Sequence, residues 1–254
     1  MIDRRRLLLG AAALGLSGCK VFDGATARDS AMRRFFAQAE GLTMTAQRAL
    51  VGDALAPEFT EADIRQGQRP NGSTDPEGAV YRALVEGGFA EFKLAVTGLV
   101  ERPQAISYAD LLAMPARTQI TRHDCVEGWS CIAKWTGVPL AHVLDLARPL
   151  PSARYAVFRC YDAIERSLSG VVTYYESIDM ADARHPQTML AFAMNDRPLP
   201  VANGAPLRLR VERQLGFKMA KYVHTVELVD SLAGVGAGRG SYWADRGYEW
   251  YAGI

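Results

Sequence analysis

The amino-acid sequence predicts a mixed α+β fold, built from short strands and few helices. Three observations support this class: the candidate strands are short, apolar and charged residues alternate strongly in the last third of the chain, and no regular strand-helix repeat occurs. The 254 residues suit one large domain, or one domain with a small extension, and can bury a sizeable core. We therefore do not expect a doubly wound parallel sheet.

The N-terminus has the pattern of an export signal. The basic run Arg4-Arg5-Arg6 precedes an apolar stretch over 7–16 and then Ser17-Gly18-Cys19. This apolar stretch is too short to span a bilayer, and small residues before a cysteine are typical of a cleavage site. The sequence predicts a signal peptide over 1–18 and a mature chain that starts at Cys19. An ordinary signal peptide and an uncleaved anchor are the alternatives.

Two details of this segment resemble known targeting signals. The arginine run followed by Leu7-Leu8 resembles a twin-arginine signal, and Leu16-Ser17-Gly18-Cys19 resembles a lipoprotein cleavage box. The resemblance implies a protein that is exported folded, with its cofactor already inserted, and that carries a lipid anchor at Cys19. The expected location is the periplasm, on a bacterial membrane. Lys20 replaces the aspartate that often retains lipoproteins in the inner membrane, which favours the outer membrane.

The next part of the chain predicts one amphipathic helix and a loop. In the range 30–50, apolar residues recur at near-helical spacing, at Phe35, Phe36, Ala39, Leu42 and Ala46. Such a helix packs on the domain or spaces it from a lipid anchor. The range 59–78 is rich in Gly, Pro, Asn and Asp, which predicts a loop. We therefore expect a linker and helix over 19–58 and the folded domain over 59–254.

The domain itself shows local signals for strands and two short helices. The ranges 92–100, 155–160 and 222–229 have the apolar content of strands. Ser107 is a suitable N-cap for a short helix that Pro115 ends. A second helix is predicted over 139–147, with Pro139 in its first turn, His142 toward solvent and an apolar face formed by Leu140, Val143, Leu144 and Ala147.

The alternation of apolar and charged residues is clearest near residue 210. Leu207, Leu209 and Val211 alternate with Arg208, Arg210 and Glu212, which predicts a strand with one buried face and one face that presents two guanidinium groups. Basic residues gather around the following glycine-bearing turn, at Arg208, Arg210, Arg213, Lys218 and Lys221. Their donors suit a bound phosphate. A charged sheet edge that only contacts solvent is the alternative.

Cys125 is the leading candidate for chemistry. It lies in the run Arg-His-Asp-Cys-Val-Glu-Gly-Trp-Ser-Cys over 122–131, where a single polarizable thiolate suits a soft metal. Zinc fits less well, because no second pair of cysteines or histidines has the close spacing of a zinc site. A disulfide between Cys125 and Cys131 is the alternative. If Cys19 is lipidated and Cys125 binds metal, Cys131 and Cys160 remain as a pair or as buried thiols.

This run resembles the molybdenum-ligand segment of the sulfite oxidase superfamily. Its Cys-Val-Glu-x-Trp-Ser form is similar to the periplasmic methionine sulfoxide reductase catalytic subunits within that superfamily. The resemblance extends from about Asn71 to about Val229, with separated matches in the same order. It implies the sulfite oxidase-like molybdopterin-binding fold of mixed β-sheets with short helices. It also implies a molybdenum-molybdopterin cofactor whose metal is held by Cys125 and a pyranopterin dithiolene.

The resemblance further implies a set of site residues. Arg122 and His123 flank the metal cysteine Cys125, and we take these three as the catalytic candidates. The cofactor-binding candidates are Asn71, Cys160, Asn203, Arg208, Lys218, Met219, Ala220 and Lys221. Two motifs carry most of them, Asn-Gly-x-Pro-x-Arg from Asn203 and Gly-Phe-Lys-x-x-Lys from Gly216. Cys160 stands where the family has threonine, so a plain buried thiol is the alternative there, as a simple Asn-Gly turn is at Asn71.

Two aromatic segments are further candidates for the pocket. Tyr174, Glu176 and His185 could bring stacking and proton transfer to its mouth, although a surface turn at His185 is as consistent with the sequence. The C-terminal aromatic residues are expected to wrap the domain, with a pocket wall or a docking site for an electron donor as the alternatives. These residues are Tyr242, Trp243, Tyr248, Trp250 and Tyr251. Glycines at 234, 236, 238 and 240 are not followed by a helix, which excludes a dinucleotide loop.

The resemblance implies an enzyme that moves two electrons by oxygen-atom transfer. The Cys-Val-Glu-x-Trp-Ser form favours reduction of an S-oxide, either a small molecule or a group within a protein. Sulfite oxidation is the alternative, because Arg122 and His123 flank the cysteine and an arginine pocket would bind the anion. A lipoprotein that uses this fold as a binding module without redox chemistry is the alternative from another class.

Composition and motifs also bear on partners. A net charge of +1, from 29 basic and 28 acidic residues, gives no global field that attracts nucleic acid. No Cys-x-x-Cys-His haem motif occurs, so we expect a cytochrome or membrane partner for electron transfer. The chain stops before the C-terminal dimerisation domain of vertebrate and plant sulfite oxidases, which leads us to expect a monomer.

Overall fold

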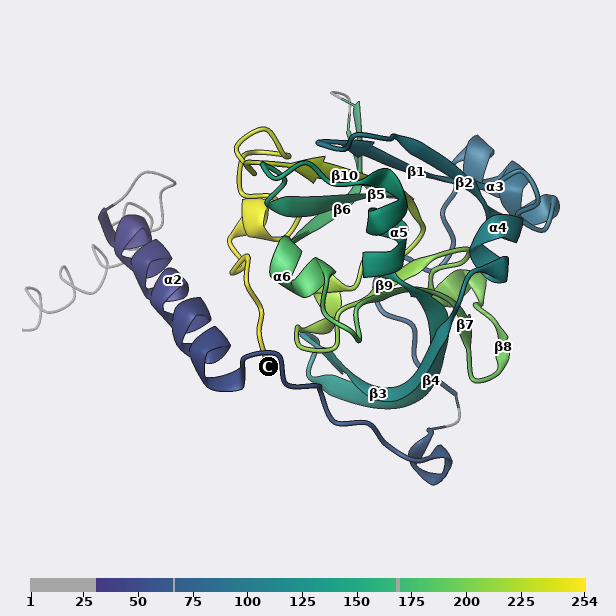
Figure 1. Ribbon diagram of the computed structural model, residues 1–254, viewed down its shortest axis with the longest axis horizontal. Coiled ribbons are helices and arrows are strands. Elements are labelled where there is room, and N and C mark those ends of the chain that lie inside the picture. Colours follow the sequence, from purple (N-terminus) through teal and green to yellow (C-terminus); the bar gives the residue numbers. More distant parts are fainter. Residues whose placement is uncertain (1–30, 66, 168–169) are drawn as a thin grey trace, which may run out of the picture. The chain divides into compact units, whose positions relative to one another are not determined.

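The computed structural model describes residues 31–65, 67–167 and 170–254 (Figure 1). The chain divides into two compact units, Met1–Gly52 and Asp53–Ile254. The described part of the first unit is helix α2 (Ala31–Val51), which confirms the helix predicted for this region. The predicted signal peptide over 1–18 and the predicted lipid anchor at Cys19 lie outside the described residues. Among the described helices, none combines the length and the apolar character needed to cross a membrane.

The second unit contains two β-sheets. The first sheet has the order β2-β1-β10-β5-β6, formed by β1 (Lys93–Gly98), β2 (Gln104–Ser107), β5 (Tyr155–Ser167), β6 (Gly170–Asp179) and β10 (Val223–Val229). The second sheet has the order β3-β4-β7-β8, with β9 also paired to β7; its strands are β3 (Arg117–Cys125), β4 (Trp129–Pro139), β7 (Met189–Met194), β8 (Arg197–Pro198) and β9 (Arg208–Arg210). Among the described strands, only β1 and β10 pair in parallel; the other named strand pairs are antiparallel.

Short helices connect the strands. The α-helices of this unit are α3 (Ala79–Glu86), α4 (Tyr108–Ala113), α5 (Leu140–Ala147) and α6 (Met180–Ala183), and the single 3₁₀ turns are η1 (Glu61–Asp63), η2 (Val201–Asn203), η3 (Gly216–Lys218) and η4 (Ala244–Arg246). Ser107 caps α4 as predicted, because its Oγ accepts a hydrogen bond from the Asp110 backbone N–H at 3.1 Å. Antiparallel strands with few short helices confirm the mixed α+β class.

Helix α5 lies between the two sheets (Figure 1). Its predicted apolar face, formed by Leu140, Val143, Leu144 and Ala147, is fully buried, and His142 is exposed as expected. Pro139 is the N-cap of α5 and not a residue of its first turn. The main hydrophobic core joins this face to apolar residues of the first sheet, and a smaller cluster surrounds Trp135 in the second sheet.

Two expectations about strands were wrong. The strand predicted to end at Cys160 continues to Ser167, because backbone pairing with β6 extends it beyond its apolar residues. The charged face of 207–212 was expected to present guanidinium groups, but Arg208 is 2% exposed and Arg210 is fully buried. Arg210 can be buried because its guanidinium pairs with Glu212 at 2.6 Å, and both side chains are inaccessible to solvent.

Candidate active site

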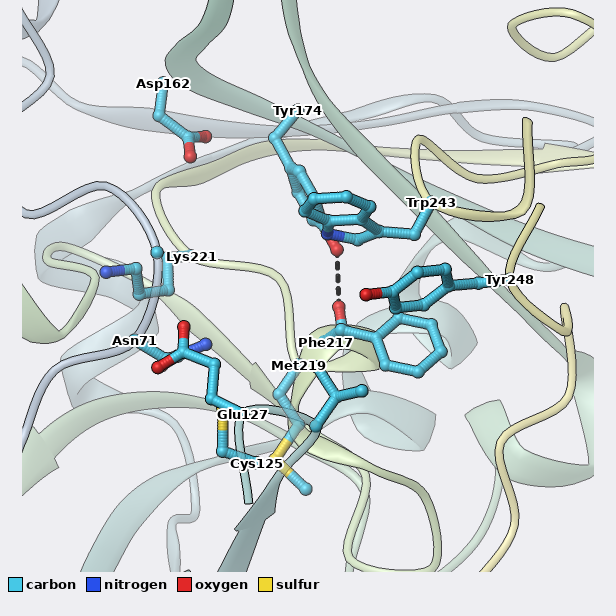
Figure 2. Close-up of a pocket in the computed structure, with 12 residues that line it drawn as sticks. Asn71, Cys125, Glu127, Asp162, Tyr174, Phe217, Met219, Lys221, Trp243 and Tyr248 are labelled. Carbon is cyan, nitrogen blue, oxygen red and sulfur yellow. Dashed lines mark hydrogen bonds between the residues drawn. The ribbon is translucent and has the colours of Figure 1, made fainter. Parts of the chain in front are cut away.

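A cavity of about 180 Å³ opens beside the end of β3. Its walls come from the loop before α3, the β3–β4 turn, β5, β6, the η3 turn and the C-terminal segment (Figure 2). The lining residues are Asn71, Gly72, Cys125, Val126, Glu127, Asp162, Tyr174, Phe217, Met219, Lys221, Trp243 and Tyr248. In Figure 2 the cysteine thiol and Met219 lie at one end, and the aromatic rings of Trp243 and Tyr248 form one side.

The β3–β4 hairpin places Cys125 in this cavity. Cys125 is the last residue of β3 and pairs with Trp129, and the Gly128 N–H returns to the Cys125 carbonyl at 3.0 Å. Gly128 adopts a φ of +82°, which a side chain would disfavour in this tight turn. Because side chains alternate along a strand, Cys125 and His123 face inward. Cys125 is thus 8% exposed, and burial raises the pKa of its thiol above the ordinary value for cysteine.

Arg122 lies on the opposite face of β3. Its side chain is 55% exposed and forms an ion pair with Asp124, with Nε 2.9 Å from a carboxylate oxygen. The structure therefore does not bring this predicted catalytic residue into the cavity. His123 is buried beside the cavity, where its Nδ1 accepts a hydrogen bond from Arg210 at 3.1 Å and lies 3.3 Å from the Met219 sulfur. Burial, together with Arg208 and Arg210, holds the pKa of His123 well below its usual range, so the imidazole is neutral.

Two buried cations, Arg208 and Lys221, donate hydrogen bonds only to neutral groups. Arg208 donates to the Asn203 carbonyl at 3.0 Å and to Asn71 Oδ1 at 2.9 Å, and its buried Nε has no hydrogen-bond partner among the described residues. Lys221 Nζ donates to the backbone carbonyls of Ser73 and Ala202. Burial lowers the pKa of Arg208 to about 9, with a further contribution from Arg210.

Burial, followed by the charge of Arg208, also lowers the pKa of Lys221 to about 7. A buried charge that is not hydrogen-bonded to a counter-charge is costly, so these groups fit an anionic ligand. The unpartnered Nε and the isolated thiol together suit a phosphate-bearing cofactor with a soft metal. In the part of the chain that the structure describes, no group of three or more His, Cys, Asp or Glu side chains could hold a metal by itself.

The structure gathers most of the other predicted cofactor residues here. Asn71, Met219 and Lys221 line the cavity, while Asn203 and Arg208 are buried behind it. These residues come from separate segments, and the motifs that begin at Asn203 and at Gly216 lie close together in the fold. The glycines of both motifs allow this close packing. A Cβ at Gly216 would lie 2.2 Å from the His123 ring, and one at Gly204 would lie 2.9 Å from Lys221.

Three further predicted cofactor residues, besides Asn203 and Arg208, also do not line the cavity. Lys218 Nζ is fully buried and pairs with Glu176 at 2.5 Å. Cys160 is buried within β5, and Ala220 acts through its carbonyl, which accepts a hydrogen bond from the Leu209 N–H at 2.8 Å. Any contact of these residues with a cofactor stays a prediction. Cys125, Cys131 and Cys160 are all free thiols, and Cys131 donates to Gln68 Oε1 at 2.7 Å, so neither disulfide considered above is formed.

The cavity also contains residues that the sequence did not single out. Asp162 is 4% exposed; its Oδ2 accepts a hydrogen bond from Ser73 at 2.6 Å, and its Oδ1 has no partner among the described residues. Burial raises the pKa of this carboxyl. Asp162 follows the strand predicted at 155–160, but no local pattern marks it. Glu127 lies within the cysteine motif itself, and Tyr174 was among the expected residues of the pocket mouth. His185 does not line the cavity.

The lowered pKa of Lys221 predicts that the stability of the cofactor-free protein depends on pH. Because the folded-state pKa of Lys221, about 7, is below its ordinary value of 10.5, the unfolded chain binds more protons between these values. The free energy of unfolding should therefore rise with pH through this window, by up to about 1.4 kcal/mol per pH unit. Urea unfolding of cofactor-free protein between pH 7 and 9.5 measures this slope. A Lys221→Met variant should lose it; equal slopes in both proteins would contradict the expectation.

Comparison with known proteins gives a consistent picture. The family profile described as "Oxidoreductase molybdopterin binding domain" matches residues 82–233. A protein of Azospira oryzae that carries the name of a protein-methionine-sulfoxide reductase subunit, YedZ1, is 36% identical over 254 residues, covering 98% of this chain and 86% of the relative. The protein-methionine-sulfoxide reductase catalytic subunit MsrP of Ralstonia nicotianae is 33% identical over 240 residues, covering 91% of this chain and 70% of the relative.

A solved structure supports the fold. The sulfane dehydrogenase SoxCD from Paracoccus pantotrophus matches with a TM-score of 0.53 and 22% sequence identity. The match covers 70% of this chain and 46% of that chain, so this chain spans less than half of its length. At this identity the likeness concerns the fold alone, and it agrees with the mixed sheets described above.

Proposed function

Because this chain belongs to the family of molybdopterin-binding oxidoreductases, we propose that it is a molybdenum enzyme that reduces S-oxides by oxygen-atom transfer. The observation that carries the proposal is the isolated thiol of Cys125 in a cavity beside the cations Arg208 and Lys221. The names of the relatives, which describe protein-methionine-sulfoxide reductases, support an oxidised sulfur substrate.

Each part of the cavity has a role in this proposal. Cys125 would hold the metal, and Arg208, Lys221 and Asn71 would bind the anionic end of the cofactor. The bound molybdenum-molybdopterin supplies the two-electron redox chemistry. Reduction of one S-oxide to a sulfide and water consumes two electrons and two protons. The buried carboxyl of Asp162 can hold one of these protons at Oδ1, since burial raises its pKa and this oxygen has no other described partner.

Sulfite oxidation receives less support from the geometry. The sequence offered Arg122 as an anion-binding residue beside the metal ligand. In the folded chain Arg122 is exposed, paired with Asp124 and directed away from Cys125. The side of the cavity formed by Trp243 and Tyr248 is aromatic, which suits an alkyl sulfur compound better than a small inorganic anion.

The experiment that tests the function is a pair of assays on purified holoenzyme. One assay follows oxidation of reduced viologen with a peptide that contains methionine sulfoxide. The other follows reduction of a one-electron acceptor with sulfite. We expect turnover in the first assay only, and the same protein isolated without cofactor serves as the control. Turnover with sulfite alone would reject the reductase proposal.

The proposed setting is the periplasm, with the chain anchored by lipid at Cys19. The basic run and cysteine box at the N-terminus support this, and we favour the outer membrane because of Lys20. The relatives are named as subunits, which supports a separate cytochrome or membrane partner that delivers electrons. Cell fractionation tests the location: replacement of Arg4, Arg5 and Arg6 by lysine should retain the unprocessed chain in the cytoplasm, and unchanged export would reject the twin-arginine route.

A further inference from the structure

The C-terminal segment 240–254 forms one wall of the cavity. Trp243 and Tyr248 of this segment stack with ring centroids 5.1 Å apart and an interplanar angle of 27°. Phe217 meets the Tyr248 ring edge-on at 5.5 Å. Together these three rings, here called the aromatic wall, line the cavity opposite polar groups such as Asn71 and Lys221 (Figure 2). The cavity is therefore apolar on one side and polar on the other.

We propose that the aromatic wall selects alkyl S-oxides and that Tyr248 is the residue that determines this specificity. The S-methyl group of a methionine sulfoxide side chain would pack on the rings, and the Tyr248 hydroxyl would donate a hydrogen bond to the sulfoxide oxygen. Polarizable sulfur and its methyl group pack favourably on aromatic rings. The inference rests on the proposed function, because it names the residues that choose the substrate of that same site.

Tyr248 is well placed for this task. It is 37% exposed, so it lies at the mouth of the cavity, where the substrate enters. Figure 2 shows its hydroxyl directed into the cavity, and no hydrogen bond engages that hydroxyl within the described residues. Val126, which is 46% exposed, adds an exposed aliphatic side chain at the cavity. An exposed apolar mouth is accessible to a side chain that projects from a polypeptide.

The segment is held on both sides of Tyr248. Before Tyr248, the Asp245 carboxylate accepts hydrogen bonds from the backbone N–H groups of Ala237, at 2.7 Å, and Arg239, at 3.0 Å, and from the Tyr175 hydroxyl. After it, the indole N–H of Trp250 donates to Ser177 Oγ at 2.8 Å. These contacts fix the rings before a ligand arrives, which reduces the entropy lost on binding.

The test measures binding and turnover in Tyr248→Leu and Tyr248→Phe holoenzymes. The ligand is a short peptide with one methionine sulfoxide, and calorimetry with the oxidised enzyme gives the dissociation constant without turnover. Loss of the ring should weaken binding about tenfold. Loss of the hydroxyl alone should weaken it about fivefold. KM should rise in parallel, while kcat changes less.

A Tyr251→Leu variant is the matched control, because Tyr251 belongs to the same segment but does not line the cavity. It should bind the peptide like the wild type, and molybdenum content should be unchanged in all variants. Equal dissociation constants for the wild type and both Tyr248 variants would overturn the inference, as would a wild type that does not bind the peptide. A wild type that binds the peptide through Tyr248 without reducing it would reject the proposed function and leave the inference standing.

Discussion

Replacement of Cys125 by serine should lower methionine sulfoxide reduction by more than about 100-fold, a larger loss than removal of a residue that only supports a metal ligand. Cys125 is the sole thiol that lines the described cavity, and serine offers a hard oxygen in place of a soft sulfur ligand. The measurements are turnover with reduced viologen, molybdenum content by elemental mass spectrometry and the electron paramagnetic resonance spectrum of Mo(V). We expect the spectrum to change even if some metal remains.

Cys131→Ser is the matched control for this variant. Cys131 lies on the neighbouring strand β4 and is also a buried free thiol, but it does not line the cavity. Serine keeps a hydrogen-bond donor for Gln68 at this position, and the substitution should leave the Mo(V) spectrum unchanged. A Cys125→Ser enzyme with wild-type activity and an unaltered spectrum would rule out Cys125 as the metal ligand.

The second large effect is expected at Arg208. Arg208→Met should lower cofactor occupancy about 10- to 100-fold, because it removes a buried cation that binds Asn71 and has an unpartnered Nε. The free energy of unfolding of the cofactor-free protein should change much less, since the substitution also removes the cost of an uncompensated buried charge. Pterin content by fluorescence after oxidation and urea unfolding of cofactor-free protein are the two measurements.

A surface arginine provides the control for charge. Arg184 is 44% exposed and pairs with Asp145 on α5, so Arg184→Met removes the same charge away from the cavity. Its cofactor occupancy should match that of the wild type. If Arg208→Met retains full occupancy, the cation does not bind the cofactor. If occupancy falls only together with stability, the residue acts through folding.

Sequence patterns correctly predicted structural features that depend on residues close together in the chain. The apolar face of α5 and the Ser107 cap of α4 were found because helical spacing and capping involve residues a few positions apart. The burial of Arg208 and Arg210 was not found, because alternation reports two faces of a strand but not what covers each face. Glu212, the counter-charge that makes burial of Arg210 tolerable, was visible in the same run.

Some residues of the site could be predicted from the sequence, and others could not. A resemblance to a family pointed to Cys125, Asn71 and Lys221, and the fold brings these three to one cavity. Asp162 and Tyr248 reach that cavity from β5 and from the C-terminal segment, and no spacing in the sequence connects them to Cys125. Such residues are brought to the site by tertiary packing, so a single sequence offers no periodic signal for them.

The contact between Gly216 and His123 links two distant parts of the chain. A single methyl group at Gly216 would overlap the imidazole, with the added carbon 2.2 Å from Cε1. His123 precedes Cys125 by two residues on the same strand face, so a displaced ring would shift the strand that carries the thiol. The position of the Cys125 thiol thus depends on the absence of a side chain at Gly216, in a turn far along the chain. Anyone who redesigns the η3 turn will have to rebuild the end of β3 with it.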